Sequence, residues 1–449
     1  MSKGWFGTDG IRGKAGEEPL TLPLMTGLGL ALGESCEGKG SALLARDTRE
    51  SGPGIATALG RGLAGSGMAV TDLGVLPTAG LALAVRQSGA DVGLVISASH
   101  NPWEDNGVKV FGADGYKIDD DRESALEEAM EACMRRPLPL DLPPTRSIDG
   151  AAAYRKTMIE KHQHLDLSGL TLAVDCAHGS ATDTAPAVLV ALGATVRPLG
   201  NRPDGRNINA QCGSTHMELL IEHVQEGGCD LGLAFDGDAD RVLMVDRRGR
   251  VCTGDHMLGF LAIWLDGLGK LPERTVVATV MSNLGFERML SDAGLKMVRT
   301  PVGDRHILET MVKSDLAIGG EDSGHLLQRF DGQLLGDGLL TSLTVMEALV
   351  ETGRDLTSVV DGVVKVPQVL LNVPVTSRPP LEDLPQLTAA QREAEEVHGD
   401  QIRILLRYSG TENLARVMVE GIEEGVVAEV SENLAKIWAE EIATKGGSG

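Results

Sequence analysis

Short runs of apolar residues alternate along most of the chain with longer segments in which apolar positions recur at helical spacing. The apolar runs lie at 42–45, 92–96, 172–174, 231–235 and 276–280, and helical patterns lie between them, for example at 57–64 and 219–224. Uninterrupted apolar strands that alternate with helices are typical of sheets covered on both faces. The pattern therefore predicts an α/β architecture with parallel or mixed sheets.

The C-terminal part follows another pattern. Strand-like runs at 402–406 and 415–419 precede one long helix, which predicts a small α+β domain. The proline-rich stretch Arg135–Thr145 indicates a first domain boundary, and we expect others near 248–253 and 364–373. The predicted domains are 1–150, 151–251, 252–366 and 367–449.

Three of the predicted strands end in polar loops that contain glycine or serine, at 95–101, 234–240 and 317–324. Open α/β sheets bind ligands beyond the carboxyl ends of their strands. We therefore expect three similar α/β units that direct these loops at one site.

The overall charge narrows the classes of ligand. The 449 residues include 41 Lys and Arg against 64 Asp and Glu, a net charge of −23, which argues against a nucleic-acid or anionic-membrane surface. An anionic small molecule would need a locally positive pocket. The first twenty residues lack the apolar core of a signal peptide, and the six cysteines form no Cys-x-x-Cys pair. We expect reduced thiols and a cytoplasmic protein.

Three carboxylates at alternate positions, Asp236, Asp238 and Asp240, follow the apolar run at 231–235. Carboxylates beside buried strands are costly unless something pairs them, and a hard divalent cation is a suitable partner. An EF-hand is excluded, because Arg241 stands where its glycine and Arg247 where its glutamate would be. The pattern predicts a hairpin tip that binds Mg²⁺; a solvated acidic turn is the alternative.

Three further loops carry candidate chemistry. Ser99 stands beside His100 at a strand end and could be a nucleophile, although it lacks a Gly-x-Ser-x-Gly elbow, and Lys109 follows on the next strand. Glu321, Ser323 and His325 lie on a glycine-flanked loop suited to sugar hydroxyls. The third loop joins an arginine, hydroxyls and a glycine, as a phosphate site would: Arg407, Ser409, Gly410 and Thr411, with Arg416 beyond. Each loop taken alone could equally be a structural turn.

Five segments together resemble the α-D-phosphohexomutase superfamily. They are GTDGIRG at 7–13, SASHNP at 97–102, DGDADR at 236–241, GGEDSGH at 319–325 and RYSGTEN at 407–413, and they appear in the family's order along essentially the whole chain. The resemblance implies three α/β domains and a small α+β domain around a central cleft. It also implies the interconversion of glucosamine 6-phosphate and glucosamine 1-phosphate, on the route to UDP-N-acetylglucosamine. The neighbouring phosphomannomutase and phosphoglucomutase activities are the alternative within the family, and a catalytically silent sugar-phosphate binding protein is the alternative outside it.

The resemblance also implies roles for individual residues. Ser99 matches the phosphoserine, whose oxygen would complete the Mg²⁺ site of Asp236, Asp238 and Asp240. Glu321 and Ser323 match sugar contacts, and the 407–411 loop matches a phosphate clamp. The charged lining of the reaction centre is matched by Arg12, His100, Lys109, Arg241 and His325. Phospho-Ser99 would give its phosphoryl group to the sugar, and the resulting 1,6-bisphosphate would turn round and return the other phosphate. Lys109 and His325 both remain candidates for the proton acceptor, and a homodimer is the family expectation.

Three positions depart from the family's motifs. Ala239 replaces a glycine of the metal loop, which would strain the loop if that position has a positive φ. Asn413 stands where the phosphate loop commonly has proline, and we expect a similar turn. Asp322 replaces a glutamine typical of the glucosamine subgroup, and its carboxylate could favour a protonated 2-amino group.

Overall fold

The computed structural model describes residues 4–7, 9–139, 141–409 and 413–446. By packing, the chain forms two compact units, one of residues 1–279 and 300–362 and the other of residues 280–299 and 363–449. Three mixed α/β sheets and an antiparallel sheet carry the fold, which confirms the predicted fold class. Among the residues described, no helix is long and apolar enough to cross a membrane.

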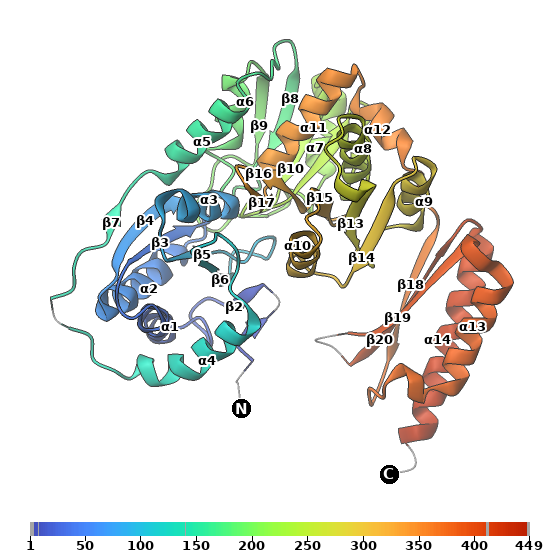
Figure 1. The fold of residues 1–449 in the computed structure, drawn as a ribbon, viewed down its shortest axis with the longest axis horizontal. Coiled ribbons are helices and arrows are strands. Elements are labelled where there is room, and N and C mark those ends of the chain that lie inside the picture. Colours follow the sequence, from blue (N-terminus) through green and yellow to red (C-terminus); the bar gives the residue numbers. More distant parts are fainter. Residues whose placement is uncertain (1–3, 8, 140, 410–412, 447–449) are drawn as a thin grey trace. The chain divides into compact units, whose positions relative to one another are not determined.

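The first sheet has seven strands in the order β1-β2-β6-β5-β3-β4-β7. Its central strands β3, β4 and β5 are parallel, whereas β6 and β2 run antiparallel to their neighbours. Helices α1 and α2 pack together on one face, and α3 lies on the other (Figure 1). The strands are β1 (Phe6–Gly7), β2 (Gly10–Lys14), β3 (Ser41–Arg46), β4 (Ala69–Val75), β5 (Val92–Ile96), β6 (Asp105–Gly112) and β7 (Arg146–Ser147), and the helices are α1 (Leu22–Ser35), α2 (Gly52–Ser66), α3 (Thr78–Ser88), α4 (Asp120–Met134) and α5 (Gly150–Lys161).

The second sheet has the order β12-β11-β10-β8-β9. Strand β10 pairs in parallel with β8 and antiparallel with β11, so the loop between β10 and β11 is the hairpin tip that the sequence predicts for the three aspartates. The elements are β8 (Thr171–Asp175), α6 (Ala185–Ala191), β9 (Thr195–Leu199), α7 (Glu218–Gly227), β10 (Leu231–Phe235), β11 (Val242–Asp246) and β12 (Val251–Cys252).

The third sheet joins β13, β15, β16 and β17, with β13 and β15 parallel and the others antiparallel. Its elements in the first unit are α8 (Gly254–Gly267), β13 (Thr275–Thr279), α10 (Asp304–Lys313), β15 (Ile318–Gly320), β16 (Leu326–Phe330), β17 (Gln333–Gly336), α11 (Gly338–Thr352) and α12 (Leu356–Gly362). Helix α9 (Leu284–Asp292) and most of β14 (Lys296–Thr300) belong to the second unit.

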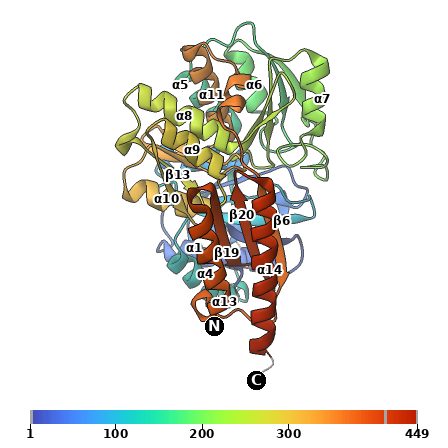
Figure 2. The same ribbon diagram turned by 90° about the vertical axis from the view of Figure 1, so that its right-hand side faces the viewer.

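The second unit contains the antiparallel sheet β18-β20-β19. Helices α13 and α14 lie side by side against this sheet, where Trp438 is fully buried (Figure 2). The apolar spacing in the C-terminal sequence reflects this burial, and the predicted α+β character is confirmed. The elements are β18 (Gln368–Pro374), α13 (Pro385–His398), β19 (Ile402–Tyr408), β20 (Leu414–Gly421) and α14 (Glu424–Gly446).

Candidate active site

Ser99 lies in the loop that follows β5, with only 1% of its surface exposed. Its backbone has φ +51°, a left-handed conformation that residues other than glycine rarely adopt. The Ser99 hydroxyl donates to Asp236 Oδ2 at 2.6 Å and lies 3.3 Å from His100 Nδ1. The loop after β5 therefore meets the loop after β10, although the two are far apart in sequence.

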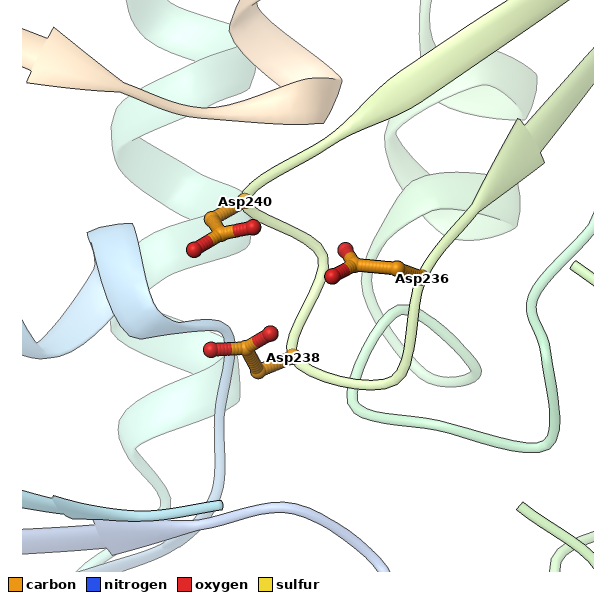
Figure 3. A group of neighbouring side chains, drawn as sticks. All are labelled: Asp236, Asp238 and Asp240. Carbon is orange, nitrogen blue, oxygen red and sulfur yellow. The ribbon is translucent and has the colours of Figure 1, made fainter. Parts of the chain in front are cut away.

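The three aspartates converge at the tip of the β10–β11 hairpin (Figure 3). All three are buried, and one carboxylate oxygen of each lies within 4.8 Å of the others. Asp238 Oδ2 accepts from Thr78 Oγ1 at 2.5 Å and from Lys109 Nζ at 2.9 Å, whereas Asp238 Oδ1 has no hydrogen-bond partner among the residues described. An unpartnered buried carboxylate oxygen in an all-oxygen cluster fits a hard divalent cation.

The charges around this cluster perturb one another strongly. Burial and the carboxylates of Asp240 and Asp238 raise the pKa of Asp236 well above its ordinary value. Burial disfavours the charge of Asp240 as well, but Lys109, His325 and Arg241 hold its pKa well below the usual range. The mutual repulsion felt at Asp236 is the kind that a bound cation relieves.

Two cations border the carboxylates from other elements. Lys109, on β6, is fully buried; burial opposes its charge, but Asp238, Asp9 and Asp240 raise its pKa well above the ordinary value. His325 Nδ1 lies 3.5 Å from Asp240 Oδ1, and despite burial the Asp240 and Asp304 carboxylates raise the pKa of His325 to about 9. Both groups can donate protons and hydrogen bonds at this centre.

A cavity of about 180 Å³ opens beside these groups within the first unit. Glu321 lines it, with Oε1 accepting from the Gly303 N–H at 3.1 Å and Oε2 from Ser323 Oγ at 3.2 Å. The loops after β5, β10 and β15 thus meet at one place, as their sequences predict. The lining residues are Asp9, Arg12, Asp240, Arg241, Val302, Gly303, Asp304, Glu321 and His325.

The sequence interpretation missed three charged residues of this site: Asp9, Lys117 and Asp304. Lys117 Nζ donates to Asp304 Oδ2 at 2.7 Å and to Asp9 Oδ1, and Asp9 also pairs with Arg12 and with Lys109. Asp9 could have been found, because it lies inside the GTDGIRG motif. Lys117 and Asp304 carry no local signal, since they are 187 residues apart in sequence.

The structure also settles two of the departures from the family motifs. Ala239 has φ +59° and is 2% exposed, so alanine occupies a left-handed position in the metal loop. Asp322 accepts at Oδ1 from the Asp255 N–H, at 3.3 Å, in the first turn of α8. Asp322 is also absent from the lining of the 180 Å³ cavity. Its carboxylate therefore binds a helix N-terminus, where negative charge is favourable.

The predicted phosphate loop belongs to the second unit, between β19 and β20. Arg407 and Arg416 lie directly opposite each other across these antiparallel strands, and burial together with the charge of Arg416 lowers the pKa of Arg407. Like charges in opposite positions are unfavourable, so an anion between them would be stabilising. Ser409 is buried and its N–H donates to Leu414 O at 2.8 Å, which closes the loop, and the Asn413 carbonyl accepts from Val375 N. Gly410 and Thr411 lie outside the described residues.

Four family models cover nearly the whole chain. They are described as the phosphoglucomutase/phosphomannomutase α/β/α domains I, II and III, matched at residues 3–136, 152–249 and 253–366, and the C-terminal domain of the same family, matched at residues 370–437.

Similar proteins agree with these matches. The phosphoglucosamine mutase of Halorhodospira halophila is 45% identical over 447 residues, 96% of each chain, and that of Deinococcus deserti is 44% identical, covering 96% of this chain and 97% of the relative. Among solved structures, a phosphoglucomutase/phosphomannomutase family protein from Burkholderia thailandensis matches with a TM-score of 0.82 at 22% identity, over 98% of each chain. The N-acetylphosphoglucosamine mutase of Aspergillus fumigatus, in complex with GlcNAc-6P and magnesium, matches with a TM-score of 0.65 at 16% identity, over 98% of this chain and 96% of that one.

Proposed function

The chain belongs to the phosphoglucomutase/phosphomannomutase family, and we propose that it interconverts glucosamine 6-phosphate and glucosamine 1-phosphate through a phosphorylated Ser99. Its curated relatives at 44–45% identity over almost the whole length are phosphoglucosamine mutases, so it is an isomerase that moves a phosphoryl group. We place it in the cytoplasm, on the route to UDP-N-acetylglucosamine.

One observation carries the assignment of the nucleophile. The Ser99 hydroxyl, held in a left-handed turn, donates at 2.6 Å to one carboxylate of a buried three-aspartate cluster. A serine in that position can transfer a phosphoryl group within a charge-neutralising site, which is most of what phosphoryl transfer requires.

The aspartate cluster is the proposed magnesium site. Asp236, Asp238 and Asp240 would hold the ion, together with an oxygen of the Ser99 phosphate. Bound there, Mg²⁺ neutralises charge on the phosphoryl group that is transferred. The magnesium in the Aspergillus fumigatus relative supports this choice of metal.

The residues of the chain then have the following tasks. The bond from the Ser99 oxygen to phosphorus breaks as the free sugar oxygen bonds to phosphorus, and the hydroxyl proton of the sugar passes to a neighbouring base. We propose Lys109 or His325 as that base. Both contact Asp240 at the edge of the cluster, which favours their protonated forms, so the one that acts must release its own proton before it accepts that of the sugar. Arg12 and Arg241 line the cavity and offset the phosphate charge, while Glu321 and Ser323 orient the sugar hydroxyls.

The second half of the cycle reverses these transfers. The 1,6-bisphosphate turns round, its other phosphate returns to Ser99, and the base gives its proton back to the oxygen that is released. Arg407 and Arg416 hold the phosphate that is not being transferred. Because either phosphate takes that place, this clamp recognises phosphate and not a particular carbon.

The direct test is Ser99→Ala in a coupled mutase assay with Mg²⁺ and a trace of the matching sugar 1,6-bisphosphate. We expect turnover to fall below detection, because the variant has no oxygen to carry the phosphate. Glucose and mannose phosphates, assayed in parallel with the wild type, test the sugar preference. Near-normal turnover by Ser99→Ala would refute the assignment of the nucleophile.

The metal site has a test that does not depend on activity. We expect Mg²⁺ to raise the melting temperature of the wild type, because a ligand of the folded state stabilises it. Asp238→Asn, which weakens the cluster with little change of shape, should show a much smaller shift. An equal shift in both proteins would place the ion elsewhere.

A further inference from the structure

Arg49, which follows β3, directs its guanidinium group at the loop that carries Ser99. Its side chain is 0% exposed and does not line the 180 Å³ cavity. Arg49 therefore does not contact a substrate bound in that cavity. Nη2 donates to the carbonyls of Ser99 and Asn101 at 3.0 and 2.9 Å, and Nη1 donates to those of Asp105, at 2.9 Å, and Pro102. One buried side chain therefore binds four carbonyl groups of the 99–105 segment.

Asp47 holds both the arginine and the loop. Asp47 Oδ2 accepts from Arg49 Nε at 2.8 Å and from Ser97 Oγ at 2.6 Å. Ser97 Oγ in turn accepts from the Ser99 N–H at 2.9 Å. The two backbone groups of Ser99 are thus both connected to the Asp47–Arg49 pair, the carbonyl directly by Arg49 and the N–H through Ser97.

Asn209, from the second α/β domain, completes the arrangement. Its Nδ2 donates to the Ser99 carbonyl at 2.8 Å and to the Asn101 carbonyl at 3.0 Å. The Ser99 carbonyl is therefore bound by donors from two domains, and each donor also binds Asn101. This is the same pair of carbonyls that brackets His100.

These contacts answer a structural need. A left-handed conformation is unfavourable for serine and persists only where the surroundings impose it. The backbone conformation of Ser99 also sets the direction of its Cα–Cβ bond, and so places Cβ where the hydroxyl can reach Asp236 at 2.6 Å. We propose that Arg49 is a positioning residue, assisted by Asn209, that holds Ser99 in the conformation required for phosphoryl transfer. The inference rests on the proposed function of Ser99.

A purely structural role predicts a different result, and Arg46 provides the control. Arg46 lies at the end of β3, only three residues earlier. Its Nη1 donates to both carboxylate oxygens of Asp72, at 2.9 and 3.0 Å. Among the residues described, its side chain makes no hydrogen bond or ion pair with the 97–105 loop. Arg46→Ala therefore removes a partly buried guanidinium of the same domain without touching the Ser99 loop.

The experiment compares Arg49→Ala, Arg49→Lys and Arg46→Ala by steady-state kinetics. We expect kcat of Arg49→Ala to fall about 100-fold with KM changed less than about threefold, because misplacement of a reacting group lowers turnover more than binding. Arg49→Lys should recover little, since one ammonium cannot reach four carbonyls in this arrangement. Added guanidinium should partly restore Arg49→Ala, and kcat of Arg46→Ala should stay within about twofold of the wild type.

A second readout follows the phosphate itself. After incubation with glucose 1,6-bisphosphate, intact-mass measurements should show Ser99 phosphorylated more slowly in Arg49→Ala than in Arg46→Ala. The inference is overturned if the two variants behave alike, or if Arg49→Ala keeps the kcat of the wild type. Absence of turnover by the wild type in the same assay would instead overturn the proposed function.

Asn209→Gly keeps the test decisive if Arg49→Ala fails to fold. Asn209 has φ +59°, which glycine adopts without strain, so the substitution removes the two donated hydrogen bonds and spares the backbone. We expect kcat to fall about tenfold with KM nearly unchanged. A folded Asn209→Gly protein with the turnover of the wild type, beside an unfolded Arg49→Ala protein, would mean that these contacts serve stability alone.

Discussion

Two residues of the candidate site are held in left-handed backbone conformations, Ser99 at φ +51° and Ala239 at φ +59°. The two cases differ in what they give the site. At Ser99 the conformation directs a hydroxyl at Asp236, so the strain has a use. At Ala239 the side chain is a methyl group without polar atoms. The N–H of Ala239 donates to the Asp236 carbonyl at 3.1 Å and its carbonyl accepts from the Gly338 N–H at 3.0 Å, two backbone bonds that glycine would also make. The strain at Ala239 should therefore be removable without loss of function.

Ala239→Gly should raise the free energy of unfolding by about 1 kcal/mol, because glycine adopts this conformation without a Cβ penalty. The three aspartates are unchanged, so Mg²⁺ binding and turnover should remain. Urea unfolding measures the gain. Ala234→Gly is the control, since Ala234 lies buried in β10 at an ordinary strand position and its replacement should destabilise. A loss of stability in Ala239→Gly would show that the loop conformation carries no strain.

The residue scale also shows what the sequence could and could not predict. Ser99 and the three aspartates were found because each follows an apolar strand within a compact motif. Arg49 and Lys117 were not, because their partners are distant in sequence, and a lone arginine or lysine is usually an exposed residue. For Asp322 the sequence suggested an effect on a protonated amino group, and the structure adds that Oδ1 accepts from the first turn of α8. The sequence shows that an acidic residue stands beside the predicted sugar-binding loop, but it does not show which neighbouring group the carboxylate binds.

At the scale of elements, α11 begins at a buried acid. Asp337 is its N-cap, with Oδ1 accepting from the N–H groups of Leu339 and Leu340, and Oδ2 accepts from Tyr154 Oη of α5 at 2.7 Å. Burial outweighs these hydrogen bonds and raises the pKa of Asp337 to about 6. The helix is thus anchored to α5 by a carboxylate whose ionisation the fold disfavours.

Replacement of this acid should change how stability depends on pH. A carboxyl group whose pKa is raised on folding favours the folded state at low pH, and this contribution is lost as pH rises through about 4 to 6. Asp337→Asn keeps the cap acceptor but cannot ionise, so its stability relative to the wild type should improve by about 1 kcal/mol between about pH 5 and pH 7.5. Urea unfolding at the two pH values measures the difference. Asp149→Asn, at the exposed N-cap of α5, is the control and should show no such gain; a pH-independent difference for Asp337→Asn would contradict the argument.

The elements themselves followed closely from the apolar pattern. The runs at 92–96 and 231–235 are β5 and β10 with the same bounds, and the helical pattern at 57–64 lies inside the longer α2. A strand that is buried on both faces is an uninterrupted run of apolar residues, so it can be recognised in the sequence. Helix α2 extends further at both ends because Pro53 is tolerated in its first turn and Gly67 ends it in a left-handed conformation, and neither adds to the apolar periodicity.

At the scale of the whole molecule, the second unit is built from two separate stretches of sequence, 280–299 and 363–449. Arg403 of β19 joins them. It donates to Glu420 Oε1 at 2.5 Å and to the carbonyls of Val280 and Ser282 at 2.9 and 3.2 Å, while Asn283 Nδ2 donates to Glu420 Oε2 at 3.2 Å. Glu420 is fully buried, and burial raises its pKa. The apolar pattern gave no sign of this connection, because it depends on polar side chains and on backbone carbonyls.

Removal of the cation should therefore loosen the junction between the two stretches. Arg403→Met removes the cation that pairs with the buried Glu420 and the donor of the Val280 carbonyl, while the Ser282 carbonyl keeps Arg299 Nη1 at 2.8 Å. This loss should cost about 3–5 kcal/mol in the unfolding of the unit. Denaturant unfolding followed by hydrogen exchange reports on both parts of the unit, the α14 amides on the 363–449 stretch and the α9 amides on the 280–299 stretch. The double variant Arg403→Met, Glu420→Leu replaces the pair with apolar side chains and should recover much of the loss. If Arg403→Met alone were as stable as the wild type, apolar packing rather than this buried pair would join the two stretches; if the double variant recovered nothing, the lost bonds to Val280 and Ser282 would be the larger part of the effect.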